Sequence, residues 1–370
     1  MPFTSAVRFV LTFLMLLSVA LSARSSQAAP EAPEDRDYWP TERWRSTTLE
    51  GQAMDPNLPA AIEQRVASET PLLSAMVVIR HGYIVYEGYY NGQDPEQPIH
   101  TWSITKSVTN IATGIAFKEG LLTDLDQTLG DLIPDKIPDG ADPRVAGITL
   151  HHLLTSTSGF QWDQRINFSR HDETDFLEPM LLRPLVCDPG ACFEYDSVNT
   201  NLLSFIIETV SGETMADYLQ SRLFEPLGIE RPEWTPMENG STRGAGGLHL
   251  TARDSAKLGF LYLNNGVWDG EQIVTEEWVE LSTREHVDGF SSVNGGNIGG
   301  GSYGYQWWVV EVNGYDLYRA NGYGGQFIYV VPELDLVVVT LVASTVRERP
   351  EEQQRPGPII DDTIIPAVLR

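Results

Sequence analysis

Residues 102–120 read WSITKSVTNIATGIAFKEG, and this stretch carries the strongest signals for both structure and chemistry in the chain. Apolar residues recur at the spacing of one helix face, and a glycine such as Gly120 commonly follows a helix end. The apolar positions are Ile104, Val108, Ile111, Ala112 and Ile115. The stretch therefore predicts a buried helix that starts next to Ser103.

Ser103 and Lys106 lie three positions apart at the start of this helix, so their side chains share one face. A serine needs a base to act as a nucleophile, and a lysine can serve when its pKa is lowered. The positive end of the helix dipole and burial both lower a lysine pKa here. Lys106 is also one of only four lysines in the chain. The alternative interpretation is that Ser103 is an ordinary N-cap and Lys106 a solvated side chain.

Strand signals stand on both sides of this helix in the sequence. Residues 75–92 alternate β-branched and aromatic residues around His81-Gly82, which is typical of two strands joined by a turn. Further strands are predicted at 305–312, 325–331 and 336–342, and helices at 202–209, 215–223, 252–264 and 276–282. This order predicts an α+β protein whose sheet joins both parts of the chain around a helical insertion.

The same order divides the chain into four parts. We expect a leader at residues 1–28 and an extended arm at 29–60, which is rich in Pro, Glu and Asp. An α/β subdomain is expected to combine 61–119 with 251–370. A mostly helical subdomain is expected at 120–250.

The first 28 residues have the pattern of a secretory signal. Arg8 precedes an apolar run at 9–20, and small residues lead to Ala28. A membrane anchor is the alternative, but it needs about 20 apolar residues. We expect cleavage after Ala28, with a site near Ala23 as second choice. The protein is then expected to be exported, periplasmic or secreted, with no membrane span left.

Composition narrows the classes of partner. The chain has 370 residues, with 25 Lys+Arg against 51 Asp+Glu and a formal net charge of −26. Such acidity argues against nucleic acid and against anionic membrane surfaces as partners. Hydrophobic residues make up 42% and charged residues 21%, which is typical of a folded globular protein. The oligomeric state is left open.

Cys187 and Cys192 are the two cysteines of the chain, and they enclose the turn sequence Asp188-Pro189-Gly190-Ala191. In an oxidising compartment, a disulfide between them is favoured over two free thiols. A metal site is the weaker alternative, because two cysteines lack partner ligands nearby.

Two other segments could contribute to a catalytic site. Tyr195 lies in a polar cluster at 193–201, where a tyrosine next to a lysine could shuttle protons. The glycine-rich turn at 320–326 could present a backbone N–H to an oxyanion. The alternatives are a helix cap with a packed aromatic ring and a flexible turn.

A second serine motif and the common metal and phosphate motifs add no further candidate site. Residues 300–304 match the G-x-S-x-G pattern around Ser302, but that motif requires a preceding strand and a following helix. A glycine run precedes Ser302 and a strand-like segment follows it, so we assign the match to chance. The seven histidines show no H-E-x-x-H spacing, and no phosphate-binding P-loop is present.

Taken together, Ser103-x-x-Lys106, Tyr195-x-Ser197 and the glycine turn before a late strand resemble the serine β-lactamase and penicillin-binding superfamily. The resemblance is greatest to its class C-like branch of esterases and amidases, and in particular to 6-aminohexanoate-oligomer (nylon-oligomer) hydrolases. Residues 150–159, 223–229, 246–253, 303–308 and 322–332 also look like that branch. The resemblance implies a β-lactamase/transpeptidase-like fold, with an antiparallel sheet flanked by helices.

The resemblance also implies roles for individual residues. Ser103 would be the nucleophile, Lys106 its base, and Tyr195 a second acid/base group. The backbone N–H groups of Ser103 and Tyr323 would hold the oxyanion. The residues implied in substrate binding are Trp162, Ser197, Gly322 and Trp307, with Trp308 as the alternative to Trp307. The implied chemistry forms an acyl-enzyme on serine and needs no metal or cofactor.

Two departures from the family pattern bear on the substrate. Class C β-lactamases have Tyr-x-Asn where this chain has Tyr195-Asp196-Ser197, and Lys-Thr-Gly where it has Ala320-Asn321-Gly322. The missing lysine would bind a substrate carboxylate, and Arg319 next to this position would face away on a strand. We therefore expect small or medium carboxylic esters as substrates, with amides second. The alternatives are a cell-wall D-Ala-D-Ala peptidase or β-lactamase, and a catalytically silent binding module.

Overall fold

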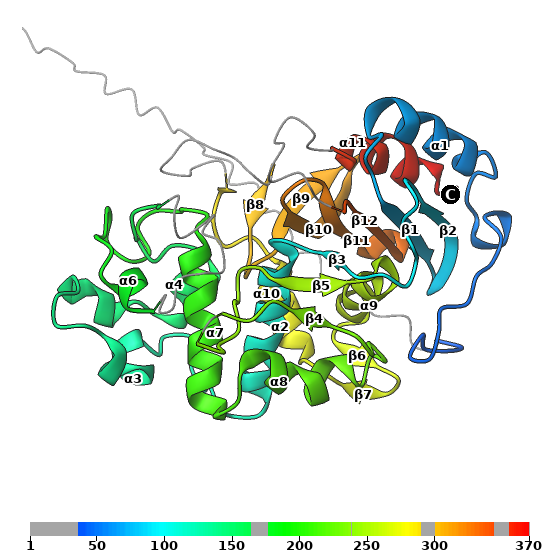
Figure 1. The fold of residues 1–370 in the computed structure, drawn as a ribbon. Helices are drawn as coiled ribbons and strands as arrows, with labels where there is room; N and C mark the ends of the chain where they lie inside the picture. Colours follow the sequence, from blue (N-terminus) through cyan, green and yellow to red (C-terminus); the bar gives the residue numbers. More distant parts are fainter. Residues whose placement is uncertain (1–35, 164–176, 238, 290–299, 344–354, 370) are drawn as a thin grey trace, which may run out of the picture. The chain divides into compact units, whose positions relative to one another are not determined.

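The computed structural model describes residues 36–163, 177–237, 239–289, 300–343 and 355–369. Its central element is a seven-stranded antiparallel sheet with the strand order β2-β1-β12-β11-β10-β9-β8 (Figure 1). The strands are β1 (Ala75–Arg80), β2 (Tyr83–Tyr89), β8 (Ser302–Tyr303), β9 (Trp308–Val312), β10 (Tyr315–Gly322), β11 (Gln326–Val331) and β12 (Leu336–Leu341). Because β1 pairs with β12, two distant parts of the chain share one sheet. The α+β prediction is confirmed.

The sheet is buried on both faces because its central strands are apolar throughout. In β12, Val337 and Val339 belong to one apolar cluster, whereas Leu336 and Val338 belong to another. Alternate side chains of a strand point to opposite faces, so each cluster covers one face. The predicted turn between β1 and β2 is formed by His81 and Gly82, both with positive φ, which suits the twist of a hairpin.

Helices cover these two faces. The first face packs against α2 (Ile104–Lys118) and α9 (Ala252–Leu263). The second packs against α1 (Leu58–Glu69) and the carboxyl-terminal turns α11 (Gly357–Ile359), η8 (Ile360–Ile364) and η9 (Ile365–Ala367). The buried helix predicted from 102–120 therefore packs on one face of the sheet.

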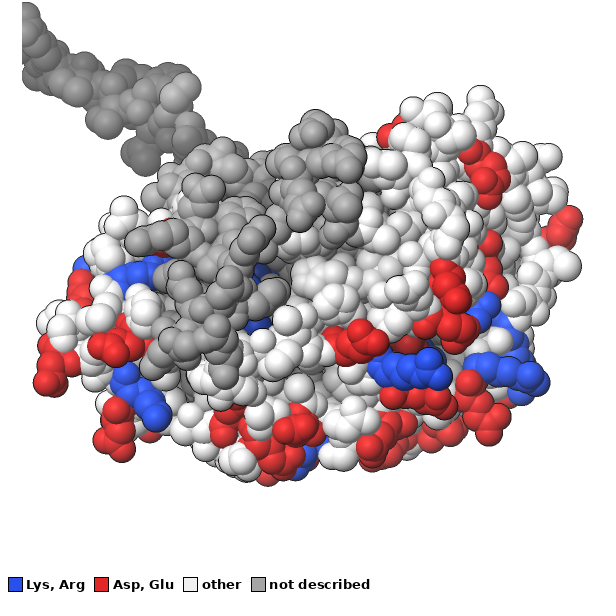
Figure 2. All heavy atoms as spheres, in the orientation of Figure 1, with Lys and Arg blue, Asp and Glu red and all other residues white. Residues whose placement is uncertain are grey.

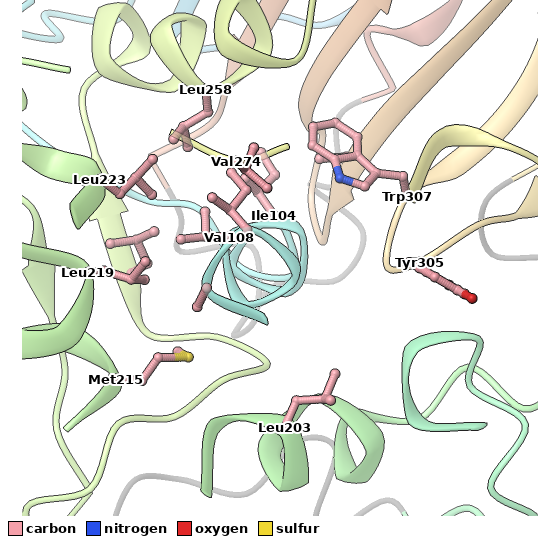
Figure 3. Close-up of a cluster of buried hydrophobic side chains, with 14 of the residues drawn as sticks. Ile104, Val108, Leu203, Met215, Leu219, Leu223, Leu258, Val274, Tyr305 and Trp307 are labelled. Carbon is pink, nitrogen blue, oxygen red and sulfur yellow. The ribbon is translucent and has the colours of Figure 1, made fainter. Parts of the chain in front are cut away.

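Helix α2 is buried on every side from Ile104 to Ala116. Figure 3 shows Ile104 and Val108 among side chains of α7 (Ser197–Ser211), α8 (Met215–Leu219) and α9. Gly114 faces the Trp278 ring so closely that any Cβ at this position would clash with it. A helix that is enclosed in this way holds its first turn rigidly.

The remaining elements connect these layers. The other helices are α3 (Leu129–Leu132), α4 (Leu150–Leu154), α6 (Leu177–Leu181) and α10 (Glu276–Thr283). Short helical turns occur at η1 (Glu50–Gln52), η2 (Pro134–Lys136), η3 (Pro143–Gly147), η4 (Gln220–Phe224) and η6 (Pro332–Leu334). A three-stranded sheet has the order β3 (Ile99–His100), β5 (Leu248–Leu250) and β4 (Glu233–Trp234). A two-stranded sheet pairs β6 (Val267–Trp268) with β7 (Glu271–Gln272).

Several predicted elements differ from the structure in their bounds. Helix α7 begins at Ser197, before the predicted 202, and β9 begins at Trp308 because Gln306 with φ of 60° forms a turn. Strand β10 lies partly in the segment that we interpreted as a glycine turn. The glycine-rich run at 295–301, before Ser302, lies mostly outside the described residues, and the division into subdomains stays a prediction.

Part of the predicted amino-terminal arm is described and packs on the body. Arg36 forms an ion pair with Asp335 at 2.8 Å, and the Trp44 indole donates to the Arg253 carbonyl at 3.0 Å. The predicted leader, residues 1–28, lies outside the described residues. Among the residues that are described, none of the helices combines the length and the apolar character needed to cross a membrane.

Candidate active site

Ser103 stands at the start of α2, and hydrogen bonds fix the segment that precedes it. The Thr101 backbone N–H and hydroxyl both donate to the Leu248 carbonyl at 2.8 Å, which ties this segment to β5. Trp102 has φ of 51°, a conformation that costs free energy for a residue with a side chain. This sharp turn places the partly exposed Ser103 at the N-cap position of the helix.

Lys106 lies one helical turn after Ser103 and is 2% exposed. Its Nζ is 3.4 Å from Ser103 Oγ, 3.1 Å from Ser197 Oγ and 3.2 Å from the Ala245 carbonyl oxygen. Burial lowers the pKa of Lys106 to about 7, and the positive charge of Arg243 adds to this effect. The negative charge of Asp196 opposes both. Near neutral pH a substantial fraction of Lys106 is therefore an unprotonated amine that can accept a proton from Ser103.

This pKa leads to a testable pH dependence. For a neutral ester, kcat/KM is expected to rise as pH increases through about 7 and then to level off. It is not expected to fall again below pH ~10, because burial raises the pKa of Tyr195 to about 12. Initial rates between pH 5 and pH 10, corrected for spontaneous hydrolysis, measure this profile. A flat profile, or a descending limb near pH 8, would contradict the assignment of Lys106 as the base.

Tyr195 reaches the same serine from the segment before α7. Its side chain forms a hydrogen bond with Ser103, and Lys106 Nζ lies 5.3 Å from the centre of the Tyr195 ring. The ring packs against Trp308 at 5.4 Å and Tyr303 at 5.9 Å between centroids. These contacts hold the Tyr195 hydroxyl in place, so it can pass a proton to or from Ser103.

The amino terminus of α7 places Tyr195 and Ser197. Asp196 is the N-cap, and its Oδ1 accepts a hydrogen bond from the Val198 N–H at 2.9 Å. Ser197 begins the helix and receives the Lys106 hydrogen bond, whereas Tyr195 precedes the cap. The structure therefore brings together Ser103, Lys106, Tyr195 and Ser197, which come from two segments about 90 residues apart.

The end of β10 approaches the start of α2. A Cβ at Gly322 would clash with the Thr101 carbonyl oxygen, so only glycine allows the strand to lie this close. The Trp102 and Tyr323 rings meet edge to face, with 5.5 Å between centroids. The end of β10 therefore lies against the segment that precedes Ser103, and the oxyanion role of the Ser103 and Tyr323 N–H groups stays a prediction.

The other predicted substrate contacts differ in their placement. Trp162 is half-buried at the end of a described segment, and its contact with substrate stays a prediction. Trp307 is 0% exposed and packs on Tyr262 in the core shown in Figure 3, so it is not brought to the site. Its neighbour Trp308 is also buried, at 2% exposed, but it packs on Tyr195 and therefore lies nearer to the site.

Ser302 and Arg319 lie on strands of the sheet. Ser302 is in the edge strand β8, which is followed by β9 and not by a helix, so the elbow geometry is missing. Arg319 contacts the hydroxyl and the ring of Tyr329 on the α1 face of the sheet. The site-facing neighbour is Ala320, a buried methyl group. This stretch of β10 therefore presents no cation to the site.

Sequence reasoning missed several groups around Lys106. The Ala245 carbonyl accepts the Lys106 hydrogen bond, and the Asn201 side chain holds the Ala245 N–H at 3.0 Å. Arg243 stands two residues earlier in the same loop and affects Lys106 through its charge. No motif marks these residues, because the loop meets α2 only through tertiary packing.

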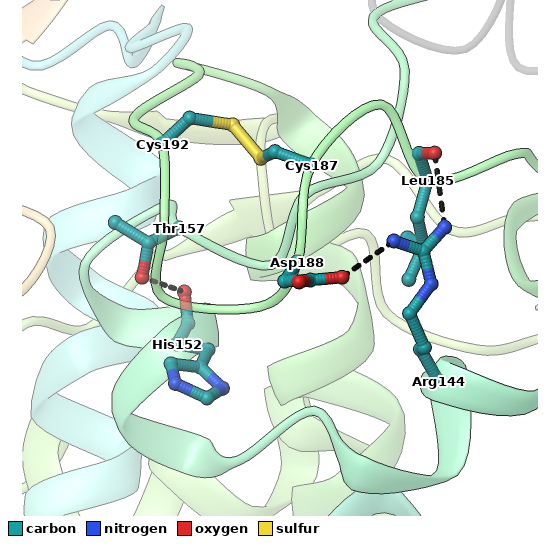
Figure 4. The surroundings of a disulfide bond; sticks show 7 residues. All are labelled: Arg144, His152, Thr157, Leu185, Cys187, Asp188 and Cys192. Atoms are coloured by element: carbon teal, nitrogen blue, oxygen red, sulfur yellow. Dashed lines mark hydrogen bonds and ion pairs between the residues drawn. A yellow bond between two sulfur atoms is a disulfide. The ribbon is translucent and has the colours of Figure 1, made fainter.

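The predicted disulfide between Cys187 and Cys192 is present (Figure 4). The loop it closes is also held by Arg144, which contacts Asp188 at 2.7 Å and the Leu185 carbonyl at 3.2 Å. Tyr195 follows Cys192 by three residues. The disulfide therefore restrains the segment that delivers Tyr195 to the site.

Replacing both cysteines by serine is expected to lower kcat by about tenfold, because Tyr195 would be less well held. The loss of unfolding free energy is expected to be about 2 kcal/mol or less, since the closed loop is short. Ester kinetics and urea denaturation measure the two effects. Wild-type protein under reducing conditions is the control and should behave like the variant; an unchanged kcat in both would refute the role.

On the face drawn in Figure 2, Lys and Arg side chains lie beside Asp and Glu side chains, and the described atoms there form no continuous basic area. Within the described ranges, no three or more His, Cys, Asp or Glu side chains are grouped so that they could hold a metal ion.

The fold and this arrangement of groups define a serine hydrolase related to the β-lactamases. The sequence profile of the Beta-lactamase family matches residues 59–357, and the chain belongs to this family. It is 28% identical over 305 residues to the 6-aminohexanoate-dimer hydrolase of Paenarthrobacter ureafaciens, which covers 76% of this chain and 74% of that protein. It is 24% identical over 208 residues to esterase EstB of Burkholderia gladioli, with 49% and 52% coverage.

A solved structure supports the same fold. The octameric penicillin-binding protein homologue from Pyrococcus abyssi superposes with a TM-score of 0.62 at 23% identity, covering 82% of this chain and 79% of that chain. At this identity the likeness shows the fold alone, and the predicted β-lactamase/transpeptidase-like architecture is confirmed.

Proposed function

We propose that this protein hydrolyses small or medium carboxylic esters, with amides second, through an acyl-enzyme on Ser103. The observation that carries the proposal is the buried Lys106 amine, 3.4 Å from Ser103 Oγ, with its pKa lowered to about 7. Ser103 attacks the carbonyl carbon as its proton passes to Lys106, and the alcohol leaves with a proton from Tyr195 or Lys106. Water then cleaves the acyl-serine bond, releasing the acid and restoring the hydroxyl.

The preference for esters over β-lactams and peptide carboxy termini rests on the missing cation. Ala320 occupies the position of the family's lysine, and Arg319 faces the other side of the sheet. A substrate carboxylate would therefore lose a charge-assisted hydrogen bond at this place, worth about 1.5–3 kcal/mol. The curated relatives named above, an amide-type hydrolase and an esterase, support the same substrate classes.

A panel of p-nitrophenyl esters, matched anilides and β-lactams tests this preference. We expect kcat/KM for the best ester to exceed that for the best β-lactam by about 10- to 100-fold or more. Steady-state rates and intact-mass measurements of the acylated protein give both values. Stable acylation of Ser103 at low β-lactam concentration would instead support a penicillin-binding protein, and no turnover of any substrate would support a binding module.

We further propose that the protein is exported. The signal pattern at residues 1–28 supports this, and so does the Cys187–Cys192 disulfide, which suits an oxidising compartment. Mass spectrometry of the protein from its natural host tests the proposal. An amino terminus at Ala29 is the expected result, and a chain that retains residues 1–28 would contradict it.

A further inference from the structure

A buried ion pair lies directly behind the candidate active site. Arg183 and Asp196 are 6% and 1% exposed at their side chains, and Arg183 Nη2 donates to Asp196 Oδ2 at 2.6 Å. The Arg183 guanidinium also lies 5.9 Å from the centre of the Phe160 ring. Burying two opposite charges is costly, and a well-packed apolar pair is often as stable. The pair therefore calls for an explanation other than stability.

Asp196 connects this pair to the reacting groups. It stands between Tyr195, which bonds to Ser103, and Ser197, which accepts a hydrogen bond from Lys106. One carboxylate oxygen caps α7 through the Val198 N–H, while the other receives Arg183. Any movement of Asp196 would therefore move both neighbours of Ser103 and Lys106.

Asp196 also supplies a charge at the site. The titratable and charged groups that face Lys106 are Tyr195 and Asp196 before α7 and Arg243 in the loop before β5. On its own helix, Ser103 is the group within reach of the amine. The Asp196 carboxylate favours the protonated form of Lys106, which cannot act as a base. A cation bound to Asp196 reduces that effect.

We propose that Arg183 is a positioning residue of this site, which holds Asp196 in its capping position and balances the negative charge that Asp196 presents to Lys106. The inference rests on the proposed function, because it assumes that Lys106 is the base for Ser103. A cap alone needs no arginine, since a neutral asparagine caps a helix as well as an aspartate. Balancing the charge of Asp196 accounts for a positively charged residue at position 183.

Four variants separate the charge from the packing. They are Arg183→Gln, Asp196→Asn, the double variant with both changes, and Arg183→Lys. The measured quantity is the second-order rate of Ser103 labelling by a neutral fluorophosphonate between pH 5 and pH 10. Circular dichroism of each variant checks folding, and if Arg183→Gln does not fold, Asp196→Asn and the double variant still give a result.

The expected shifts have opposite signs. In Arg183→Gln, the Arg183 cation no longer offsets the Asp196 carboxylate, so the ascending limb of the rate–pH profile moves to higher pH by about 1 unit. In Asp196→Asn the carboxylate is lost and the Arg183 charge remains, so the ascending limb of the rate–pH profile moves to lower pH. The double variant returns to within about 0.3 pH unit of the wild type, and Arg183→Lys leaves the limb in place with a rate reduced a few-fold.

A merely structural pair would give a different pattern. Single variants that lower the rate uniformly, or that shift the limb in the same direction, would overturn the inference. Failure of the wild-type protein to label at Ser103 would instead refute the proposed function, before any variant is compared. The two failures are thus distinguishable.

Discussion

Replacing Lys106 by methionine is expected to lower kcat/KM for a neutral ester by about 10³-fold, since general base catalysis typically contributes 10²–10⁴. Methionine has a similar length and fits the same buried position, but it cannot accept the Ser103 proton. The Ser197 hydroxyl and the Ala245 carbonyl would lose their Lys106 partner without a change in the surrounding helices. Steady-state ester kinetics measure the loss.

The same variant is expected to be more stable at neutral and acidic pH. The pKa of Lys106 is about 7 in the folded protein and close to 10.5 when unfolded, so the unfolded chain binds a proton more tightly. The destabilisation by Lys106 is therefore full below pH 7 and fades as pH rises toward 10.5. Lys106→Met should raise the unfolding free energy by about 2 kcal/mol or more at pH 6, and less at pH 9. Urea denaturation at the two pH values measures the difference.

Lys257→Met is the matched control for this experiment. Lys257 is also buried, but on α9, where it donates to the Gly228 carbonyl at 2.7 Å and the Thr41 carbonyl at 3.3 Å. It has no role in the proposed chemistry, so kcat/KM should stay within about threefold of the wild type. Equal losses of activity in the two variants would mean that a buried lysine is needed for folding and not for catalysis.

Replacing Tyr195 by phenylalanine is expected to lower kcat by about 10²-fold, with a smaller effect on KM. The ring and its packing against Trp308 and Tyr303 would remain, and only the hydroxyl that bonds to Ser103 would be lost. An effect confined to kcat indicates a group that acts in the transition state. Ester kinetics at saturating substrate provide the value.

Tyr303→Phe tests whether any hydroxyl in this aromatic cluster would have the same effect. Tyr303 packs on Tyr195, but its hydroxyl is directed to Gln306 Oε1 at 3.3 Å. Its removal should change kcat by no more than a few-fold. If Tyr303→Phe were as damaging as Tyr195→Phe, or if Tyr195→Phe were fully active, the acid/base role of Tyr195 would be wrong.

The parts of the fold that follow local patterns could be predicted from the sequence. The apolar spacing after Ser103 predicted α2, and the alternation around His81-Gly82 predicted the β1–β2 hairpin. The start of α7 could not be predicted in this way, because Ser197, Asn199, Thr200 and Asn201 are polar yet buried. Their partners come from other elements, such as Gln306 for Thr200. Local propensity carries no information about such partners.

The candidate site, too, could be predicted only where local sequence determines the geometry. The meeting of Ser103 and Lys106 follows from helix geometry, and the approach of Tyr195 and Gly322 was expected only from the family resemblance. Trp307 and Trp308 could not be separated, because both rings are buried and only tertiary packing places Trp308 against Tyr195 and Trp307 against Tyr262. The charges of Arg243 and Asp196 act on Lys106 through space, and no sequence pattern marks them.

The central claim is that Ser103 is the activated nucleophile, and covalent labelling tests it most directly. The protein is treated with a fluorophosphonate, weighed intact and digested to locate the modified peptide. We predict a single adduct on Ser103 that is absent from Ser103→Ala. An adduct on Ser302, or no adduct on protein shown to be folded, would contradict the account.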